Sequence, residues 1–275
     1  MNYNIRILSE NTADRATVTS SSPIAAGLPL SNLKTNLRGQ VCRSLTNSLD
    51  LTLEWPELES VGVVVLPLTS LLGSSTIRVK AFLNAADTTP MLDTGVVYAA
   101  PGAVLDNWDF SQPLNVNAFS DTDLPTVVCF LGELVACKKV TIEIVDPDAS
   151  FIDVSRLVVG PYIELKYGAS YGAASSLIDL TKSTRAESGD SISDWGPKAR
   201  SLSFDLEWIS EPDRAKVRQI LFKGVGKNIF VSLITNSDDP VLVRDYSIYG
   251  KQAQAGSMSF AFYQTHATKI TIESF

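Results

Sequence analysis

Apolar and polar residues alternate along several stretches of the chain with a period of two, the pattern of a β-strand buried on one face. The segment Leu49–Trp55 (LDLTLEW) has an apolar residue at every second position. Pro56 follows it, and because proline cannot donate a backbone hydrogen bond, we expect the strand to end there. The run Val61–Leu66 is almost continuously β-branched, which favours a strand buried on both faces. The same patterns predict further strands at Thr76–Leu83, Thr126–Phe130, Lys139–Val145 and Phe151–Gly160.

The second half of the chain combines more strand patterns with one helix signal. Ser201–Ile209 alternates strictly, and Ser210 directly after it is a good helix N-cap. Acidic residues follow in the first turn, an apolar stripe then recurs at helical spacing, and a glycine provides a stop. The pattern therefore predicts one α-helix at about 211–223. Further strands are expected at Asn228–Ile234, Val241–Tyr249, Ser257–Gln264 and Ile270–Ile272.

These elements predict an all-β protein of two β-sandwich domains, 1–166 and 167–275. An α/β fold is excluded because no long amphipathic helix occurs before Gly168, whereas parallel strands need a crossover helix after nearly every strand. The small residues of Tyr167–Ser176 form either a linker or the first loop of the second domain, which is predicted to be a β-sandwich with the single helix inserted. A short strand is also expected around Ile5 and Ile7, at the start of the first domain.

The charge of the chain excludes two classes of partner. The formal net charge is −7 and no cluster of Lys and Arg stands out, so we expect no binding to nucleic acid. No window approaches the ~20 apolar residues of a membrane span, so we expect no membrane insertion. The N-terminus carries charges early and lacks the apolar core of a signal peptide, which indicates a protein made in the cytoplasm.

Three cysteines, an odd number without a CxxC motif, argue against a disulfide framework and against a zinc site. If Gly132 and Glu133 formed a two-residue hairpin turn, Cys129 would face Ala136 and Cys137 would point to the opposite side of the sheet. We therefore expect free, buried thiols.

The sequence contains no catalytic motif. A nucleophile needs a base, and the single histidine, His266, lies in the polar stretch QTHATK, where we expect it to be solvated. The nucleophile elbow GxSxG, the phosphate loop GxxxxGK and the zinc motif HExxH are all missing. We therefore predict a protein that is not an enzyme and that carries no cofactor and no metal.

Two groups of residues are candidates for binding. Asp106 and Asp109 flank Trp108, and an aromatic ring with carboxylates can bind a sugar, although aspartates also form turns and can hold calcium. Trp195 lies in the polar stretch SDWGPK, where it is either an interface anchor or a core residue folded back from its loop. All of these alternatives remain open.

The order of the segments in the first domain resembles that of discoidin-like (galactose-binding-like) β-sandwiches, eight-stranded jelly rolls that are used mainly for binding. The residues that carry this resemblance are a loop rich in Asn and Ser before Arg43, then LDLTLEW, VGVVVLPL, TIRVKAFL, KKVTIEIVD and FIDVSRLVVG. The segment FIDVSRLVVGPYIELKYG, together with SLSFDLEWISEPDRAKVRQILFKGVGKNIFVSLIT, resembles minor tail and tail-tip proteins of long-tailed bacteriophages, whose second β-domain is similar to part of the distal tail protein. Carried over, Ile152, Arg156, Leu157, Val159 and Gly160 form the segment I-x-x-x-R-L-x-V-G.

The resemblance implies a structural component of a phage tail tip or baseplate that links the tail tube to receptor-binding parts. Its partners would be other tail proteins and further copies of itself in a trimeric or hexameric ring, in a virion tail assembled in the host cytoplasm. Trp195 with the loop 182–198, and the region 84–125, are the expected contact surfaces. The alternative is a carbohydrate-binding module for a cell-surface glycan, with Trp108, Asp106, Asp109 and Arg43 as contacts.

Arg156 gives one further expectation. It stands among apolar residues in the segment that runs from the first domain towards the second. Its guanidinium therefore needs a carboxylate or carbonyl partner, and we expect that partner at the interdomain seam.

Overall fold

The structure is a computed structural model that describes residues 4–100, 126–196, 198–224, 226–235, 240–253, 257–262 and 265–274. Contacts within the chain divide it into two compact units. The sandwich unit contains the described residues of Glu10–Ile163 and of Asp238–Arg244. The C-terminal unit contains those of Met1–Ser9, Glu164–Ser237 and Asp245–Phe275.

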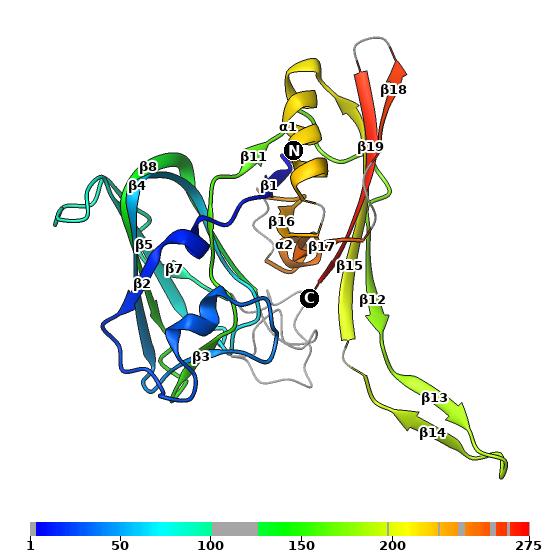
Figure 1. Cartoon of the computed structure of the whole chain (residues 1–275), viewed down its shortest axis with the longest axis horizontal. Helices are drawn as coiled ribbons and strands as arrows, with labels where there is room; N and C mark the ends of the chain where they lie inside the picture. The colour runs from blue at the N-terminus through cyan, green and yellow to red at the C-terminus, as the bar shows by residue number, and fades with distance from the viewer. Residues whose placement is uncertain are drawn as a thin grey trace. The chain divides into compact units, whose positions relative to one another are not determined.

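Antiparallel pairing in the sandwich unit joins seven strands in one sheet, in the order β10–β4–β8–β5–β6, with β2 paired to β4 and β7 to β5 (Figure 1). Strands β3 and β9 form a separate pair. The strands are β2 (Thr17–Ser20), β3 (Cys42–Ser44), β4 (Ser48–Leu66), β5 (Thr76–Phe82), β6 (Leu92–Asp93), β7 (Val97–Tyr98), β8 (Val127–Val145), β9 (Ile152–Val154) and β10 (Val158–Gly160). Two 3₁₀ helices, η1 (Thr12–Arg15) and η2 (Leu30–Lys34), precede β2 and β3.

Strand β4 runs through Pro56, so the prediction that the strand ends there is wrong. The pairing of β4 with β8 is irregular between Glu54 and Glu59, and the proline lies within that stretch. A proline is tolerated where no ladder hydrogen bond is required of it. The half of β4 before the irregularity pairs with β2, whereas the half after it pairs with β10.

The pattern on the two halves of β4 is otherwise as predicted. Leu49, Leu51 and Leu53 are buried, and Val61–Leu66 is buried on both faces. The partners of the leucines on β8 are Ile144, Ile142 and Val140, which are also buried. These residues belong to one hydrophobic core that extends through the sandwich unit.

Strand β8 contains no hairpin turn at Gly132, so the supposed pairing of Cys129 with Ala136 does not occur. The strand continues through Gly132, whose φ of 85° is in the left-handed region, and its register with β4 shifts next to this residue. The free, buried thiols are confirmed for Cys42, Cys129 and Cys137. Burial raises the pKa of each of these thiols to about 11.

The C-terminal unit is built on an eight-stranded antiparallel sheet in the order β11–β1–β16–β17–β19–β15–β12, with β18 paired to β19 (Figure 1). Strands β13 and β14 form a separate two-stranded hairpin. The strands are β1 (Arg6–Leu8), β11 (Ile163–Glu164), β12 (Ala174–Asp179), β13 (Lys182–Arg185), β14 (Ser191–Asp194), β15 (Lys198–Ile209), β16 (Asn228–Ser232), β17 (Ser247–Gln252), β18 (Met258–Phe262) and β19 (Thr265–Ser274). Helix α1 (Glu211–Lys223) belongs to this unit, whereas α2 (Pro240–Asp245) lies, apart from its last residue, in the segment Asp238–Arg244 of the sandwich unit.

The predicted strand at Val241–Tyr249 is wrong in its first half, which forms α2. Proline at the first position of a helix is favourable because it has no N–H that would need a partner there, and Pro240 begins α2. The strand expected around Ile5 is β1, and it pairs with β16, so that Ile7 lies opposite Val231. The alternation of apolar residues predicts a strand here, but it carries no information about a partner more than 200 residues away.

Helix α1 has the predicted bounds, and its stripe of Val217, Ile220 and Leu221 is buried. Ser210 precedes it but does not cap its backbone N–H groups. The Ser210 hydroxyl instead donates to the buried carboxylate of Asp213 at 2.8 Å. In the part of the chain that the structure describes, neither helix has the length and apolarity of a membrane span.

Candidate interaction surfaces

The β13–β14 hairpin is the most exposed element of the C-terminal unit. Every residue of both strands is exposed, and the hairpin extends from the ends of β12 and β15 away from the rest of the sheet (Figure 1). Its two strands are joined by backbone pairing and by a 3.0 Å contact between the hydroxyls of Ser183 and Ser191. The hairpin therefore has no hydrophobic core of its own.

Trp195 lies directly after β14 and is 85% exposed, so it does not fill the core of the C-terminal unit. This result excludes the interpretation of Trp195 as a core residue, while its role as an interface anchor stays a prediction. Ile192 in β14 is also largely exposed. Other large apolar side chains that the C-terminal unit exposes are Tyr167, Tyr171, Leu177, Leu180, Trp208, Phe222 and Phe260.

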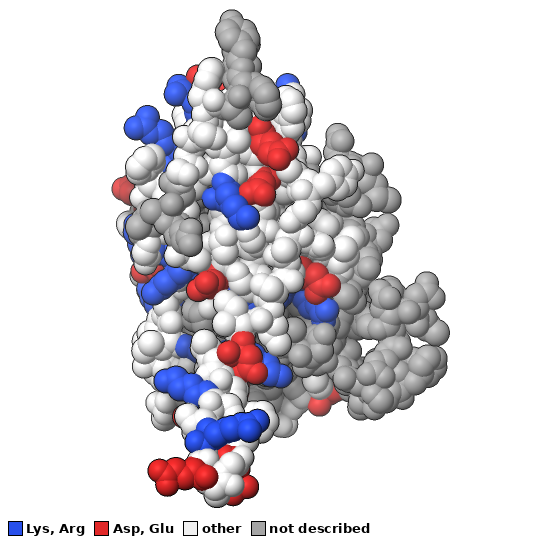
Figure 2. Space-filling view, turned by 90° about the vertical axis from the view of Figure 1, so that its right-hand side faces the viewer, with Lys and Arg blue, Asp and Glu red and all other residues white. Residues whose placement is uncertain are grey.

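The far end of the hairpin is acidic. Glu187 and Asp190 lie in the turn between β13 and β14, and Gly189 there has a φ of 91°, which favours glycine. The Ser188 hydroxyl donates to the Asp190 carboxylate at 2.8 Å. Figure 2 shows acidic side chains at the end of this projection and basic side chains next to them, and the basic residues of β13 are Lys182 and Arg185.

The outer face of α1 forms a second candidate surface, which the sequence analysis missed. A hollow of about 440 Å³ is lined by Arg214, Ala215, Arg218, Gln219 and Phe222. Phe222 is 69% exposed, and the guanidinium of Arg218 lies 5.4 Å from the centre of its ring. The spacing of four residues between the two was the only sequence signal, and it is common on solvated helix faces.

Arg43 is held on the surface of the sandwich unit by two neighbours. Its Nε and Nη2 each donate to a carboxylate oxygen of Asp153 at 2.7 Å, and its guanidinium lies 4.2 Å from the centre of the Phe151 ring. The hydrogen bonds to Asp153 raise the pKa of Arg43. Pairing between β3 and β9 brings these residues together across more than 100 positions, so no local pattern predicted Asp153 as a partner.

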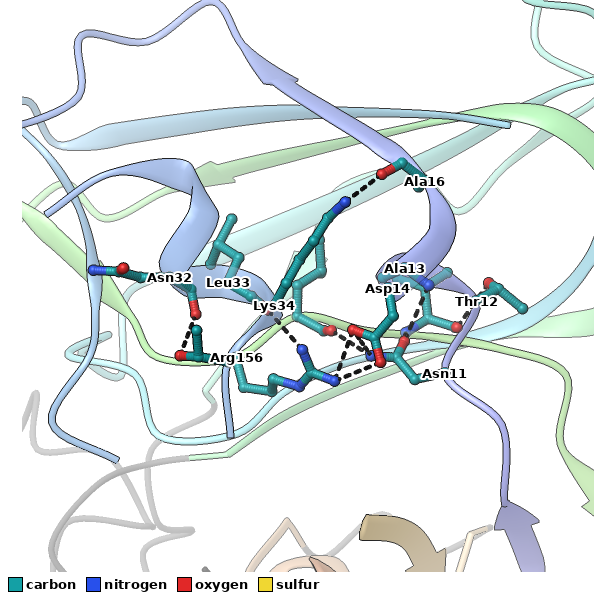
Figure 3. A network of polar contacts seen from close by, with 12 residues as sticks. Asn11, Thr12, Ala13, Asp14, Ala16, Asn32, Leu33, Lys34 and Arg156 are labelled. Carbon is teal, nitrogen blue, oxygen red and sulfur yellow. Dashed lines mark hydrogen bonds and ion pairs between the residues drawn. The ribbon is translucent and has the colours of Figure 1, made fainter. Parts of the chain in front are cut away.

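Arg156 joins both 3₁₀ helices to the closing strands of the sandwich unit. The Arg156 side chain is 2% exposed, and its Nη2 lies 2.8 Å from the Asp14 carboxylate in η1. Nη1 donates to the carbonyl oxygen of Leu33 in η2 at 3.3 Å, and Figure 3 shows the guanidinium between these two residues. Both partners belong to the sandwich unit, whereas a contact at the interdomain seam stays a prediction.

The side chains of Thr12 in η1 and of Asn11, the N-cap residue before it, extend this network. Asn11 donates to the Leu157 carbonyl oxygen at 3.0 Å and accepts from the Val159 N–H at 2.9 Å, and the Thr12 hydroxyl donates to the Val159 carbonyl oxygen at 2.8 Å (Figure 3). The segment that carries the tail-protein resemblance is therefore a structural junction inside the sandwich unit.

His266 is buried, so the prediction that it is solvated is wrong. It is 8% exposed because β19 begins at Thr265 and carries it into the sheet, opposite Ile209. Its Nε2 lies 3.0 Å from a carboxylate oxygen of Glu211, and its ring meets that of Phe260 edge-on. Among the described residues, no three His, Cys, Asp or Glu side chains are grouped to hold a metal ion. The remaining glycan candidates, Trp108, Asp106 and Asp109, lie outside the described residues.

No family model matches the chain, and no curated protein matches it. Chitosan-binding module 1 of a chitosanase/glucanase from Paenibacillus sp. IK-5 is similar in structure, with a TM-score of 0.36 at 14% identity over 55% of this chain and 99% of the module. A fucose binding module of Streptococcus pneumoniae has a TM-score of 0.36 at 12% identity over 55% of this chain and 95% of the module. A GH29 fucosidase from Ruminococcus gnavus has a TM-score of 0.40 at 10% identity over 56% of this chain, which spans only 27% of the enzyme.

The predicted fold class is confirmed. The described residues are mostly β-strands in antiparallel sheets, with one long helix at the predicted position.

Proposed function

We propose that the chain is a structural binding protein of a larger assembly, and that its β13–β14 hairpin contacts the neighbouring protein. The observation that carries this proposal is that every residue of both hairpin strands is exposed. An isolated two-stranded hairpin is marginally stable in water because it buries too little apolar surface. Contact with a partner would supply the burial that the hairpin lacks.

The composition of the hairpin suits a contact surface. Trp195 and Ile192 are the large apolar residues that a partner would cover, and a buried tryptophan at an interface contributes ~2 kcal/mol or more. The serines at positions 183, 191 and 193 present hydroxyl groups, which lose less free energy on burial than charged groups do.

We further propose the tail tip or baseplate of a long-tailed bacteriophage as the setting, which rests on the sequence resemblance. The chain would be a virion protein without catalytic activity, assembled in the host cytoplasm as a ring of three or six copies that binds other tail proteins. The domain limits 1–166 and 167–275 belong to the same proposal.

Immuno-electron microscopy of particles produced by the genome that encodes this chain tests the setting. We expect an antibody against the chain to label one end of the tail. Trp195→Ser tests the role of the β13–β14 hairpin and should reduce incorporation of the chain into particles several-fold. Leu58→Ser, which removes an exposed apolar side chain from the sandwich unit, is the matched control and should leave incorporation unchanged. Labelling nowhere on the particle would overturn the setting, and equal incorporation of both variants would overturn the role of the hairpin.

Carbohydrate binding by the sandwich unit is the second candidate. The observation that favours it is the partly exposed group of Arg43, Asp153 and Phe151, in which fixed charged donors and acceptors lie beside an aromatic ring. Sugar hydroxyls bond to such charged groups, and sugar rings stack on aromatic faces. Trp108, Asp106 and Asp109 would add further contacts.

A glycan array with the full chain tests this candidate. We expect binding that Arg43→Ala and Trp108→Ala each reduce at least about tenfold, the equivalent of ~1.4 kcal/mol. An array without bound glycans, or binding that neither substitution changes, would exclude the candidate.

A further inference from the structure

We infer that the acidic tip of the β13–β14 hairpin docks onto the outer face of α1 in a second copy of this chain, and this inference rests on the proposed assembly function. It names the partner and the receiving surface, which the proposed function leaves open. The observation that supports this inference is that one chain presents both an exposed acidic hairpin tip and an exposed hollow lined by arginines.

The receiving surface combines positive charge with an apolar floor. Arg218 stacks on Phe222, so its guanidinium is held in place while its edge stays available to an acceptor. Among the described residues, no carboxylate lies within ion-pair distance of Arg218, and Arg214 pairs only with the exposed Glu211, at 2.9 Å. A carboxylate from a partner would therefore complete this surface without breaking a buried contact.

The entering element has the opposite charge. Glu187 and Asp190 are both exposed in the hairpin turn, and the hydrogen bond from Ser188 holds the Asp190 side chain. Because the turn lies at the end of a projection, it can enter a shallow hollow that the flat face of a sheet cannot fill (Figure 2).

The partner is a second copy, because one copy cannot satisfy its own hairpin. Within the C-terminal unit, α1 and the hairpin lie at opposite ends (Figure 1). A contact between two different patches of identical chains is head-to-tail, and such contacts close into rings when the rotation between copies allows it.

Charge reversal in the full-length chain tests the contact. Sedimentation velocity over a concentration series would compare the parent chain, Arg214→Glu/Arg218→Glu, Glu187→Lys/Asp190→Lys, and the chain that carries all four changes. We expect each pair of reversals to weaken self-association at least about tenfold and the four together to restore it to within about threefold of the parent. Glu57→Lys/Glu133→Lys, which changes two exposed acids of the sandwich unit, is the control and should have no effect.

Restoration by the four changes supports the inference, because it requires the two patches to meet. The inference is overturned if the paired reversals weaken self-association and the four changes together do not restore it, or if neither paired reversal weakens it. A parent chain that is monomeric at every concentration also overturns it. Thermal melting of each variant shows that the loss does not come from unfolding. A separate variant tests the proposed function: Lys182–Asp194 is replaced by a two-residue turn. If this variant is incorporated into particles as well as the parent chain is, the proposed function is overturned.

Discussion

Removing the carboxylate of Asp14 tests the role of Arg156 as a structural junction. The guanidinium is 2% exposed, and in Asp14→Ala it would lose a charged acceptor 2.8 Å away while the Leu33 carbonyl oxygen remains. A hydrogen bond between charged groups contributes ~1.5–3 kcal/mol when it is buried. Because the Asp14 side chain is 48% exposed, solvent screens the pair, and we expect a loss of ~1–2 kcal/mol in the free energy of unfolding.

Urea unfolding at pH 7, followed by tryptophan fluorescence, measures this loss. Trp55 reports on the same region, since its Nε1 donates to the Thr12 carbonyl oxygen at 2.9 Å. Arg156→Met removes the charge but keeps most of the volume, so a double-mutant cycle with Asp14→Ala isolates the pair, and we expect a coupling of ~1 kcal/mol. Asp50→Ala, another surface carboxylate of this unit, should cost less than ~0.5 kcal/mol. A coupling near zero would refute the junction.

Four further predictions concern stability and reactivity. Since burial raises the pKa of the three thiols from 9.0 to about 11, we expect Ellman's reagent at pH 8 to modify them ~100-fold more slowly in the folded chain than in urea. The buried thiols contribute fully to the free energy of unfolding below pH 9, and this contribution is lost as the pH rises towards 11 because the unfolded chain ionises its thiols first. Unfolding at alkaline pH measures this loss. Asp213→Ala should cost ~1–3 kcal/mol in urea unfolding, because the buried carboxylate accepts from Ser210 and from the Lys166 N–H; equal stability of this variant would contradict the assignment. Gly62→Ala should destabilise the sandwich unit by ~1–3 kcal/mol, since its Cβ would lie 2.9 Å from the ring of the buried Tyr162 and 2.5 Å from the exposed Leu134 side chain; Leu134→Ala in the same chain should recover only a small part of the loss, and full recovery would contradict the contribution of Tyr162.

Strands with a strict period of two were predictable because that period depends only on neighbouring residues. Leu49–Trp55 and Ser201–Ile209 are strands for this reason, and α1 has the helical period and end signals. Pro56 was misinterpreted because a bulge, which tolerates proline, depends on the partner strand and leaves no local pattern.

The site residues were less predictable because their surroundings come from distant parts of the chain. His266 is polar in its local sequence but is buried by pairing with Ile209, and Arg43 meets Asp153 only through β3 and β9. Trp195 could be an anchor or a core residue from the sequence alone, since one isolated aromatic residue does not define which side of a loop it occupies. Its exposure in the folded chain removed the second alternative.

Hydrogen exchange of the β13–β14 backbone amides measures most directly whether this hairpin is the contact element. The exchange rates of the isolated chain would be compared with those of the same chain in its assembled particle. We predict that assembly slows exchange at Lys182–Arg185 and Ser191–Asp194 at least about tenfold, because a partner covers strands that are exposed in the single chain. Equal exchange of these amides in both states would contradict it.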